Sequence, residues 1–418
     1  MPTQTRQRNE PTPQPVDRIG FSAITRMAYD GVSLMPLWQQ LMAKVDGGVA
    51  TPGDGLDLAL VTQLLGEGQA GHAIQTEVLA VHQLFRSLSR TGAAAGALRV
   101  LALAADTAMG DNTPIEFLLD QPGVELTTLY VVPGIALPDP LPAHDVTIVI
   151  AANVEDSRGA LAEIARLAPI WPAPLLNGPT KIRMLDRDTT PVLLAGIDGL
   201  EVPARIALTR AELAAVAQGT HPLAEIADGL DFPITARPRG ARAGQGLCRI
   251  ANRAALADYL AARAEDDFVV QRFVDTASED GLFRKYRLVV IDGQPYACHM
   301  AISEQWNAWY VTAGMAQSPS KQLEEATFFY TFDFGFALRH RTPLTELITR
   351  IGLDYFTIDC AQDANGDLVV FEIGNTAVVH DMDSDEQLPY RSRQMNKLFD
   401  AFAAMLLYRA RQAVRSAA

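Results

Sequence analysis

The sequence of 418 residues predicts a mixed fold: a helical N-terminal segment, then a small open α/β domain, then a longer α+β part. Three observations support this prediction. Apolar residues recur at helical spacing over residues 17–90. Over residues 96–180, apolar strands alternate with helices, which is typical of a mostly parallel sheet. Further along, β-branched and aromatic runs flank Asp292-Gly293 and Asn365-Gly366, which are typical turns of β-hairpins.

The composition excludes several classes of protein. Hydrophobic residues make up 48% of the chain, which is enough for sizeable cores. The net charge of −14 argues against general binding to nucleic acids or anionic membranes. No apolar run approaches the roughly 20 residues of a membrane span. Cys248, Cys298 and Cys360 lack metal-type spacing and indicate free thiols in a reducing compartment. We therefore expect a cytoplasmic protein without nucleic-acid or membrane partners.

The first part of the chain divides into a tail and a helical region. Residues 1–16 are polar and rich in proline, so we expect a disordered tail. Residues 17–95 are expected to form a helical N-terminal region, because apolar residues recur at helical spacing as far as Leu84 and Phe85. A lid, a dimerisation surface and a partner-docking module are all compatible with this pattern.

Residues 96–180 are expected to form the small α/β domain. Buried strands are predicted near residues 98–104, 126–132 and 146–151, and a helix over 161–167. Ligands of such sheets bind at the carboxyl ends of the strands. A binding cleft at the turn around Asn112 is therefore one interpretation, but the pattern favours a plain helix start.

A loop rich in arginine and glycine follows a short strand near residue 235. The strand ends at Arg237, and the loop contains Gly240, Gly244 and Gly246. Glycines let backbone N–H groups approach phosphate oxygens, and arginines pair with phosphates through two hydrogen bonds. The pattern favours phosphate binding over a solvated flexible hairpin.

The last hairpin brings two acids together. Asp359 lies near the end of its first strand and Glu372 near the end of its second, so paired strands place both carboxylates side by side. Asn375 follows at once. Carboxylate and amide oxygens suit Mg²⁺, which proteins usually hold through one or two carboxylates plus substrate phosphates. The hairpin alone is equally compatible with solvated surface acids.

Taken in order, these parts resemble the ATP-grasp superfamily of carboxylate–amine ligases, with a layout similar to glutathione synthetase and D-alanine–D-alanine ligase. The resemblance covers residues 96–410. It implies two α+β lobes that clamp ATP, a small lobe over residues 181–265 and a large lobe with a C-terminal helix over 266–418. The domain at 96–180 precedes them.

The resemblance also implies the roles of individual residues. Mg²⁺ would be held by Asp359, Glu372 and Asn375. Catalysis would depend on Arg287 and Arg237. The phosphates and nucleoside of ATP would contact Arg187, Arg237, Gly240, Gly244, Gly246, Gln271, Arg272, Phe273 and Asp275. Substrate contacts are expected from three residues near the ends of motifs, namely His299, His380 and Arg391.

Three departures from the family pattern stand out. Arg187 and Arg237 occupy positions where lysines are usual, which keeps the charge and adds bidentate geometry. Gln271 replaces a common hinge glutamate. Glu372 and Asn375 are three residues apart rather than two, so we expect a bulge at Gly374 to restore the position of the amide.

The resemblance implies an ATP-dependent ligase that joins a carboxylate to an amine through an acyl phosphate. ATP and Mg²⁺ would be its cofactors, and small-molecule or peptide acids and amines its partners. A homodimer, formed through the N-terminal helices or the last helix, is left open. A non-catalytic nucleotide-binding scaffold and a phosphotransferase without an amine step are the alternatives.

Overall fold

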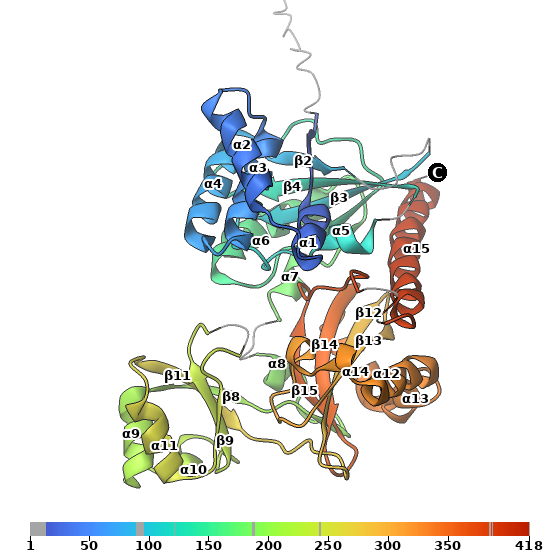
Figure 1. Cartoon of the computed structure of the whole chain (residues 1–418). Helices are drawn as coiled ribbons and strands as arrows, with labels where there is room; N and C mark the ends of the chain where they lie inside the picture. Colours follow the sequence, from blue (N-terminus) through green and yellow to red (C-terminus); the bar gives the residue numbers. More distant parts are fainter. Residues whose placement is uncertain are drawn as a thin grey trace, which may run out of the picture.

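The computed structural model of the chain contains three β-sheets, stacked from the N-terminal part to the two lobes (Figure 1). It describes residues 14–88, 96–120, 122–185, 189–241, 244–383, 386 and 388–417. Within these residues, no helix is both long and apolar enough to cross a membrane.

The first sheet belongs to the α/β domain and has the strand order β1-β2-β4-β3-β5-β6. Its central strand β3 pairs in parallel with β4 and β5, and only β2 and β4 are antiparallel, so the predicted mostly parallel sheet is confirmed. The strands are β1 (Val16–Arg18), β2 (Leu84–Ser87), β3 (Leu98–Ala105), β4 (Val124–Val131), β5 (Val146–Val149) and β6 (Leu175–Leu176).

The helical N-terminal region also contributes strands to this sheet. Four helices are present, but the prediction that Leu84 and Phe85 continue a helix is wrong, because both lie in β2 and are buried in two different apolar clusters. β1 begins at Val16, inside the stretch expected to be a tail. The helices are α1 (Phe21–Tyr29), α2 (Met35–Asp46), α3 (Pro52–Leu64) and α4 (Gly68–Val81), followed in the α/β domain by α5 (Ile115–Leu118), α6 (Arg158–Leu167) and α7 (Pro179–Ile182).

The small lobe is a four-stranded antiparallel sheet backed by helices, with the order β10-β9-β11-β8. Thr209 opens its first helix through a capping box with Glu212. Its elements are β8 (Arg205–Thr209), α9 (Arg210–Gln218), α10 (Leu223–Ile226), β9 (Ile234–Pro238), β10 (Cys248–Ile250), α11 (Arg253–Ala261) and β11 (Asp267–Arg272). The preceding α8 (Thr190–Leu193) and β7 (Leu200–Glu201) lie outside this sheet, and β7 pairs with the large lobe.

The large lobe is a five-stranded sheet with the order β13-β12-β14-β15-β7. Asp292 and Gly293 both have positive φ, as the predicted hairpin turn requires. The elements are β12 (Phe283–Ile291), β13 (Gln294–Ser303), α12 (Pro319–Thr331), α13 (Phe336–Arg339), α14 (Arg341–Ile351), β14 (Tyr355–Gln362), β15 (Leu368–Gly374) and α15 (Arg391–Ala417). Short 3-10 turns lie at Glu155–Ser157, Ala168–Ile170, Tyr310–Thr312 and Met315–Gln317.

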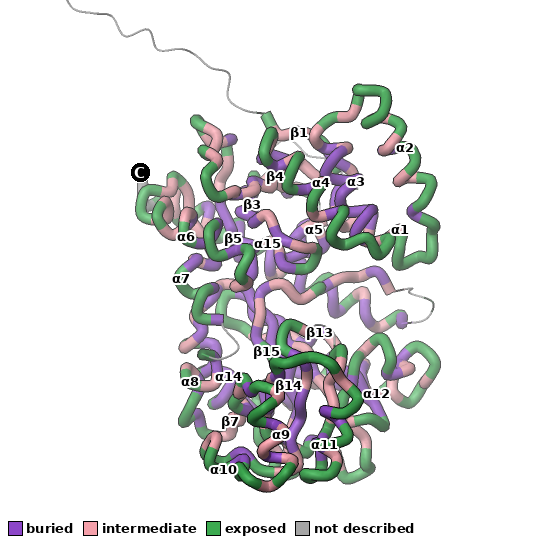
Figure 2. The backbone as a smooth tube through the Cα atoms, turned by 90° about the vertical axis from the view of Figure 1, so that its left-hand side faces the viewer, coloured by how far each residue is buried: buried purple, intermediate pink, exposed green. Residues whose placement is uncertain are grey.

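The three sheets do not share one core. Helix α15 joins the large lobe to the α/β domain, because Phe402 lies in an apolar cluster with Val289 of β12 and Val100 of β3. The small lobe has a cluster of its own, around Ile234 and Val270. Figure 2 shows the buried residues concentrated along the centres of the sheets. The small lobe is therefore packed separately from the body formed by the other two parts.

Candidate active site

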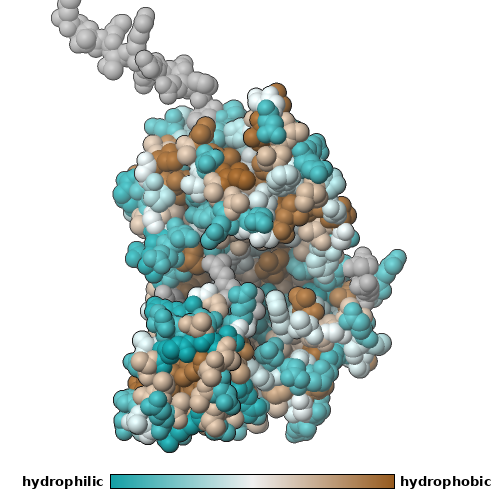
Figure 3. Space-filling model, turned by 60° about the vertical axis from the view of Figure 1, so that its left-hand side comes forward, coloured by the Kyte–Doolittle hydropathy of each residue, from teal (hydrophilic) through white to brown (hydrophobic). Residues whose placement is uncertain are grey.

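A cavity of about 1070 Å³ lies between the two lobes and reaches the end of α1. It is lined by strands of the small lobe, by the β12–β15 strands, by the loop over residues 303–317 and by the start of α15. In Figure 3 the surface is hollowed between the upper part of the molecule and the lobes below it. Its two ends differ in chemistry, and they are described in turn.

Basic side chains from both lobes line the first end, which we call the phosphate end. Arg205 and Arg237 come from the small lobe, and Lys285 and Arg287 come from the large lobe. Arg205 bridges the lobes, because its Nη2 donates to the Phe371 carbonyl at 2.5 Å. Cations from two separately packed lobes thus converge on one cavity, which suits a polyanion such as a triphosphate.

The two predicted carboxylates lie at this end and are direct cross-strand partners, as expected from the hairpin. Asp359 is 4% exposed and pairs with Arg287 at 2.7 Å and with Lys285 at 2.8 Å. Burial alone would raise the pKa of Asp359, but the charges of Arg287 and Lys285 outweigh burial and hold that pKa below its usual range. Asp359 is therefore ionised at neutral pH.

Asn375 does not accompany these carboxylates. Its side chain is 2% exposed, lies outside the cavity lining and donates from Nδ2 to the Ala151 carbonyl at 3.0 Å. The bulge expected at Gly374 is also misplaced: the register shifts between Asp359 and Cys360, whereas Gly374 pairs regularly with Thr357. The amide therefore packs against the α/β domain and does not face the cavity.

The described residues contain no cluster of three His, Cys, Asp or Glu side chains that could hold a metal by itself. Asp359 and Glu372 nevertheless provide two neighbouring carboxylates on the cavity wall. This donor set fits Mg²⁺ only if phosphate oxygens complete the coordination, which is the usual way proteins bind that ion.

The predicted hinge strand reaches the cavity at alternate residues. Gln271 and Phe273 line it, and the Gln271 Oε1 accepts from Arg205 Nε at 3.2 Å. The Phe273 ring contacts Trp306 edge to face and lies 4.1 Å from the Arg249 guanidinium carbon. These side chains form a partly aromatic wall of the kind that can hold a planar base.

Other residues predicted for the nucleotide lie elsewhere. Gly244 lines the cavity, but Gly240 does not, and at Gly246 an added Cβ would meet Pro238 at 2.7 Å, so that glycine serves loop packing. Arg272 is exposed and pairs with Glu201 of β7, and Asp275 accepts from the Ala277 amide of its own loop. Both residues are outside the cavity lining. Side chains alternate between the two faces of a strand, so Arg272 points to the opposite face from Gln271. Arg187 lies outside the described residues.

An adjoining part of the cavity, which we call the substrate end, contains all three residues predicted to contact substrate. His299 is the cross-strand partner of Arg287, and burial holds its pKa well below the usual value. Burial likewise lowers the pKa of His380 to about 4. Arg391, the first residue of α15, is 5% exposed. The two imidazoles are therefore neutral at pH 7 beside a buried cation.

Sequence reasoning missed several residues that line the cavity, among them Arg205, Lys285, Asp383 and Tyr29. Lys285 lies in a basic run of the sequence, at residues 284–287, but its ion pair with Asp359 depends on the register of β12 and β14. Asp383 lies in an acidic stretch after the last hairpin, a signal that could have drawn notice. Tyr29, at the end of α1, enters the cavity from the N-terminal region, and no local pattern indicated this.

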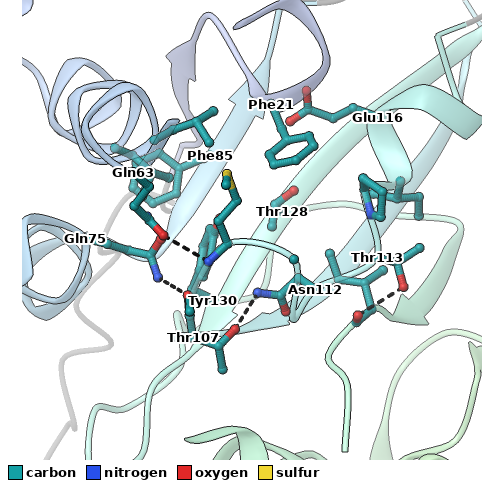
Figure 4. A pocket seen from close by; sticks show the side chains of 18 of the residues that line it. Phe21, Gln63, Gln75, Phe85, Thr107, Asn112, Thr113, Glu116, Thr128 and Tyr130 are labelled. Carbon is teal, nitrogen blue, oxygen red and sulfur yellow. Dashed lines mark hydrogen bonds between the residues drawn. The ribbon is translucent and has the colours of Figure 1, made fainter. Parts of the chain in front are cut away.

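A second, smaller cavity of about 80 Å³ lies between the N-terminal helices and the first sheet. Its polar side chains bond backbone groups and one another within the cavity wall, as Figure 4 shows. Gln75 donates to the Thr107 carbonyl at 2.9 Å, Gln63 accepts from the Met109 amide at 3.0 Å, and Asn112 donates to the Thr107 hydroxyl at 3.1 Å. The Asn112 turn thus braces the loop after β3.

No family model matches the sequence, and no curated protein matches it. Solved structures with similar architecture include an ATP-grasp RimK domain protein from Sphaerobacter thermophilus, at 17% identity and a TM-score of 0.38 over 74% of this chain and 99% of that one. A D-alanine–D-alanine ligase from Bacillus anthracis is 14% identical, with a TM-score of 0.45 over 77% and 100% of the two chains. A VanG D-Ala:D-Ser ligase from Enterococcus faecalis is 10% identical, with a TM-score of 0.43 over 74% and 99%.

The architecture itself matches the layout expected from the motifs. A small α/β domain precedes a four-stranded and a five-stranded lobe, each backed by helices. The lobes enclose one cavity, and the last hairpin places Asp359 and Glu372 on its wall. This is the arrangement that the resemblance to ATP-grasp proteins implies.

Proposed function

We propose that the protein is an ATP-dependent ligase that joins a carboxylate to an amine through an acyl phosphate. One observation carries the proposal: the cavity between the lobes brings cations from both lobes to face the carboxylates of Asp359 and Glu372. This arrangement suits a nucleotide triphosphate that must be held, neutralised in charge and oriented for transfer of its terminal phosphoryl group.

The proposed reaction has two steps. An oxygen of the substrate carboxylate attacks the γ-phosphorus of ATP, and the bond from that phosphorus to the bridging oxygen of ADP breaks. The amine nitrogen then attacks the carbonyl carbon of the acyl phosphate, and inorganic phosphate leaves. The nitrogen gives up its proton to solvent or to the departing phosphate, since no general base is assigned.

The chain contributes mainly position and charge. Arg237 and the loop at Gly244 approach the phosphates from the small lobe, while Lys285 and Arg287 approach from the large lobe. Negative charge develops on the transferred group, and fixed cations in a partly buried site stabilise it more than they would in water. Arg287 is best placed for this role, since its pair with Asp359 fixes the guanidinium.

Asp359 and Glu372 would hold Mg²⁺ together with the phosphates, and the ion would neutralise charge on the β- and γ-phosphate oxygens. Asn375 is not proposed as a ligand, because its amide is committed to Ala151. At the far side of the phosphate end, Gln271 and Phe273 would hold the adenine.

The test measures ADP formation with Mg²⁺ and ATP across a panel of amino acids, short peptides and simple amines, followed by mass analysis of the products. We expect ADP together with an amide, and loss of ADP formation in Glu372→Ala. Glu346→Ala, an exposed glutamate on α14, is the matched control. Unchanged turnover in Glu372→Ala would overturn the metal assignment.

The same products separate the alternatives. ADP with a stable phosphate ester or acyl phosphate would identify a phosphotransferase. Binding of Mg-ATP in calorimetry without ADP formation would identify a nucleotide-binding scaffold. No binding of Mg-ATP at all would refute the proposed function.

A further inference from the structure

A network of buried polar groups lies behind the substrate end. Arg391 Nη1 donates to the Tyr310 hydroxyl at 2.6 Å, and that hydroxyl donates to Glu325 at 3.0 Å. Glu325 is 0% exposed and also accepts from the Tyr390 hydroxyl and from the Met300 amide. A buried carboxylate with three donors is fully satisfied, so this network holds the Arg391 guanidinium in one place.

The opposite side of Arg391 is formed by Asp383, whose side chain is 10% exposed. Asp383 Oδ2 lies 3.1 Å from Arg391 Nη1, and Asp383 Oδ1 accepts from the Tyr29 hydroxyl of α1 at 2.9 Å. Arg26 pairs with Asp381 in the same stretch at 2.7 Å. Helix α1 therefore attaches to the substrate end at two points.

Three polar atoms of residues that line this end have no hydrogen-bond partner among the described residues: Arg391 Nε, Asp383 Oδ2 and His299 Nδ1. A buried polar atom left without a partner destabilises the fold, so such atoms are uncommon unless a ligand supplies the partner. Arg391 Nε thus has donor capacity left. Asp383 Oδ2, which makes an ion pair with Arg391 Nη1 at 3.1 Å but no hydrogen bond, has acceptor capacity left, and both residues line the same cavity. A ligand group that carries both charges would use both.

We propose that Asp383 and Arg391 form a subsite for a zwitterionic head group of the substrate. Asp383 takes its ammonium group, and Arg391 takes its carboxylate. Tyr29 is a positioning residue, because it holds Asp383 Oδ1 and so directs Oδ2 to the ligand. The N-terminal helix α1 is then part of the substrate site. This inference rests on the proposed function, for which it identifies the binding site of one substrate.

The test uses glycine, ethylamine and acetate as probes of the full-length protein, in NMR titrations. We expect glycine to bind about tenfold more tightly than either single-charge probe, since it gains a second charge-assisted hydrogen bond. Asp383→Asn should reduce glycine binding to the level of acetate. If glycine shows no preference over ethylamine and acetate, or keeps it in Asp383→Asn, the subsite is refuted.

Tyr29 is tested by the ratio between probes, because the residue is 52% exposed and its loss leaves the core intact. Tyr29→Phe should lower the preference for glycine over acetate about threefold, by loss of one hydrogen bond, and leave acetate binding unchanged. Equal weakening of both probes would indicate a merely structural role. Tyr330→Phe, on α12 and 82% exposed, is the control.

Calorimetry with Mg-ADP separates this inference from the proposed function. If the wild type binds Mg-ADP but shows no preference for glycine, only the subsite is wrong. If it prefers glycine but binds no Mg-ADP, the ligase proposal is wrong and the subsite stands. Variants that bind Mg-ADP normally are correctly folded, so their probe ratios report on the subsite alone.

Discussion

The two ends of the cavity are built in opposite ways. At the phosphate end, Arg237 and Arg287 come from lobes with separate cores, and Arg287 is held on the cavity wall by its ion pair with Asp359. At the substrate end, Arg391 is buried in a closed network that includes Glu325 and Tyr310. The first end is suited to close around a large anion that arrives with its own counter-ion. The second end is shaped before any ligand arrives, which favours selection among small substrates.

Removal of a cation from the phosphate end should have the largest effect. In Arg287→Met, we expect ADP formation to fall by about 100-fold or more, because a fixed charge near the transferred phosphoryl group is lost. The rate of ADP release in a coupled assay measures this. Arg166→Met, on the exposed face of α6, should leave the rate unchanged. A normal rate in Arg287→Met would show that the cation does not act on the phosphates.

Glu325→Gln should show how much the buried network at the substrate end stabilises the fold. The substitution replaces the buried carboxyl group that accepts three hydrogen bonds, and one amide nitrogen then faces donors. We expect the free energy of unfolding to fall by about 2 kcal/mol. Urea denaturation gives this value, with the exposed Glu346→Gln as control. Equal stability of the two variants would mean that the network around Glu325 does not stabilise the fold.

The two ends should also differ in how they contribute to stability at low pH. His380 has a pKa of about 4 because it is buried, against about 6.5 when the chain is unfolded. The unfolded chain therefore binds more protons between these values. The contribution of neutral, buried His380 to the free energy of unfolding is therefore fully present above pH 6.5. It is lost as the pH falls towards 4, by up to about 1.4 kcal/mol per pH unit.

Urea unfolding at several pH values between 4.5 and 7 measures this loss. We expect a flatter profile for His380→Gln than for the wild type. Parallel profiles would show that His380 titrates in the same range folded and unfolded. Asp359, whose pKa is held low by Arg287, should contribute no slope in this window.

The smallest effects are expected on the hinge strand, and they compare neighbouring residues. Arg272→Ala and Asp275→Asn should leave the KM for ATP unchanged and alter stability by at most about 0.5 kcal/mol, because both residues are exposed and outside the cavity. Gln271→Ala should raise the KM for ATP several-fold. A raised KM for ATP in Arg272→Ala would show that the strand contacts the nucleotide through its opposite face.

Local patterns predicted much of the fold. The mostly parallel first sheet, the Asp292-Gly293 hairpin turn and the pairing of Asp359 with Glu372 follow from short-range rules, namely the spacing of apolar residues, turn chemistry and strand register. The strand at Leu84 was missed because it has only four residues and begins just two residues after a helix, which is too little pattern to show that the period has changed.

The candidate site was predicted in outline. The resemblance implied that Arg287, Asp359 and Glu372 belong to one site, and all three line one cavity in the structure. The prediction failed for Asn375, because its amide has a tertiary partner, Ala151, that is 224 residues away in the sequence. The prediction also treated Gln271 and Arg272 alike because they are adjacent in a motif. Side chains alternate along a strand, so only Gln271 faces the cavity.

By itself, the sequence determined the elements and the order of the lobes, because helix and strand periods, turns and caps are properties of neighbouring residues. It also determined which carboxylates meet on the last hairpin. Only the tertiary structure decided that the N-terminal helix α1 reaches the substrate end, through the hydrogen bond from Tyr29 to Asp383. Contacts between residues more than 350 positions apart depend on how separate sheets and helices pack, and no local pattern encodes that packing.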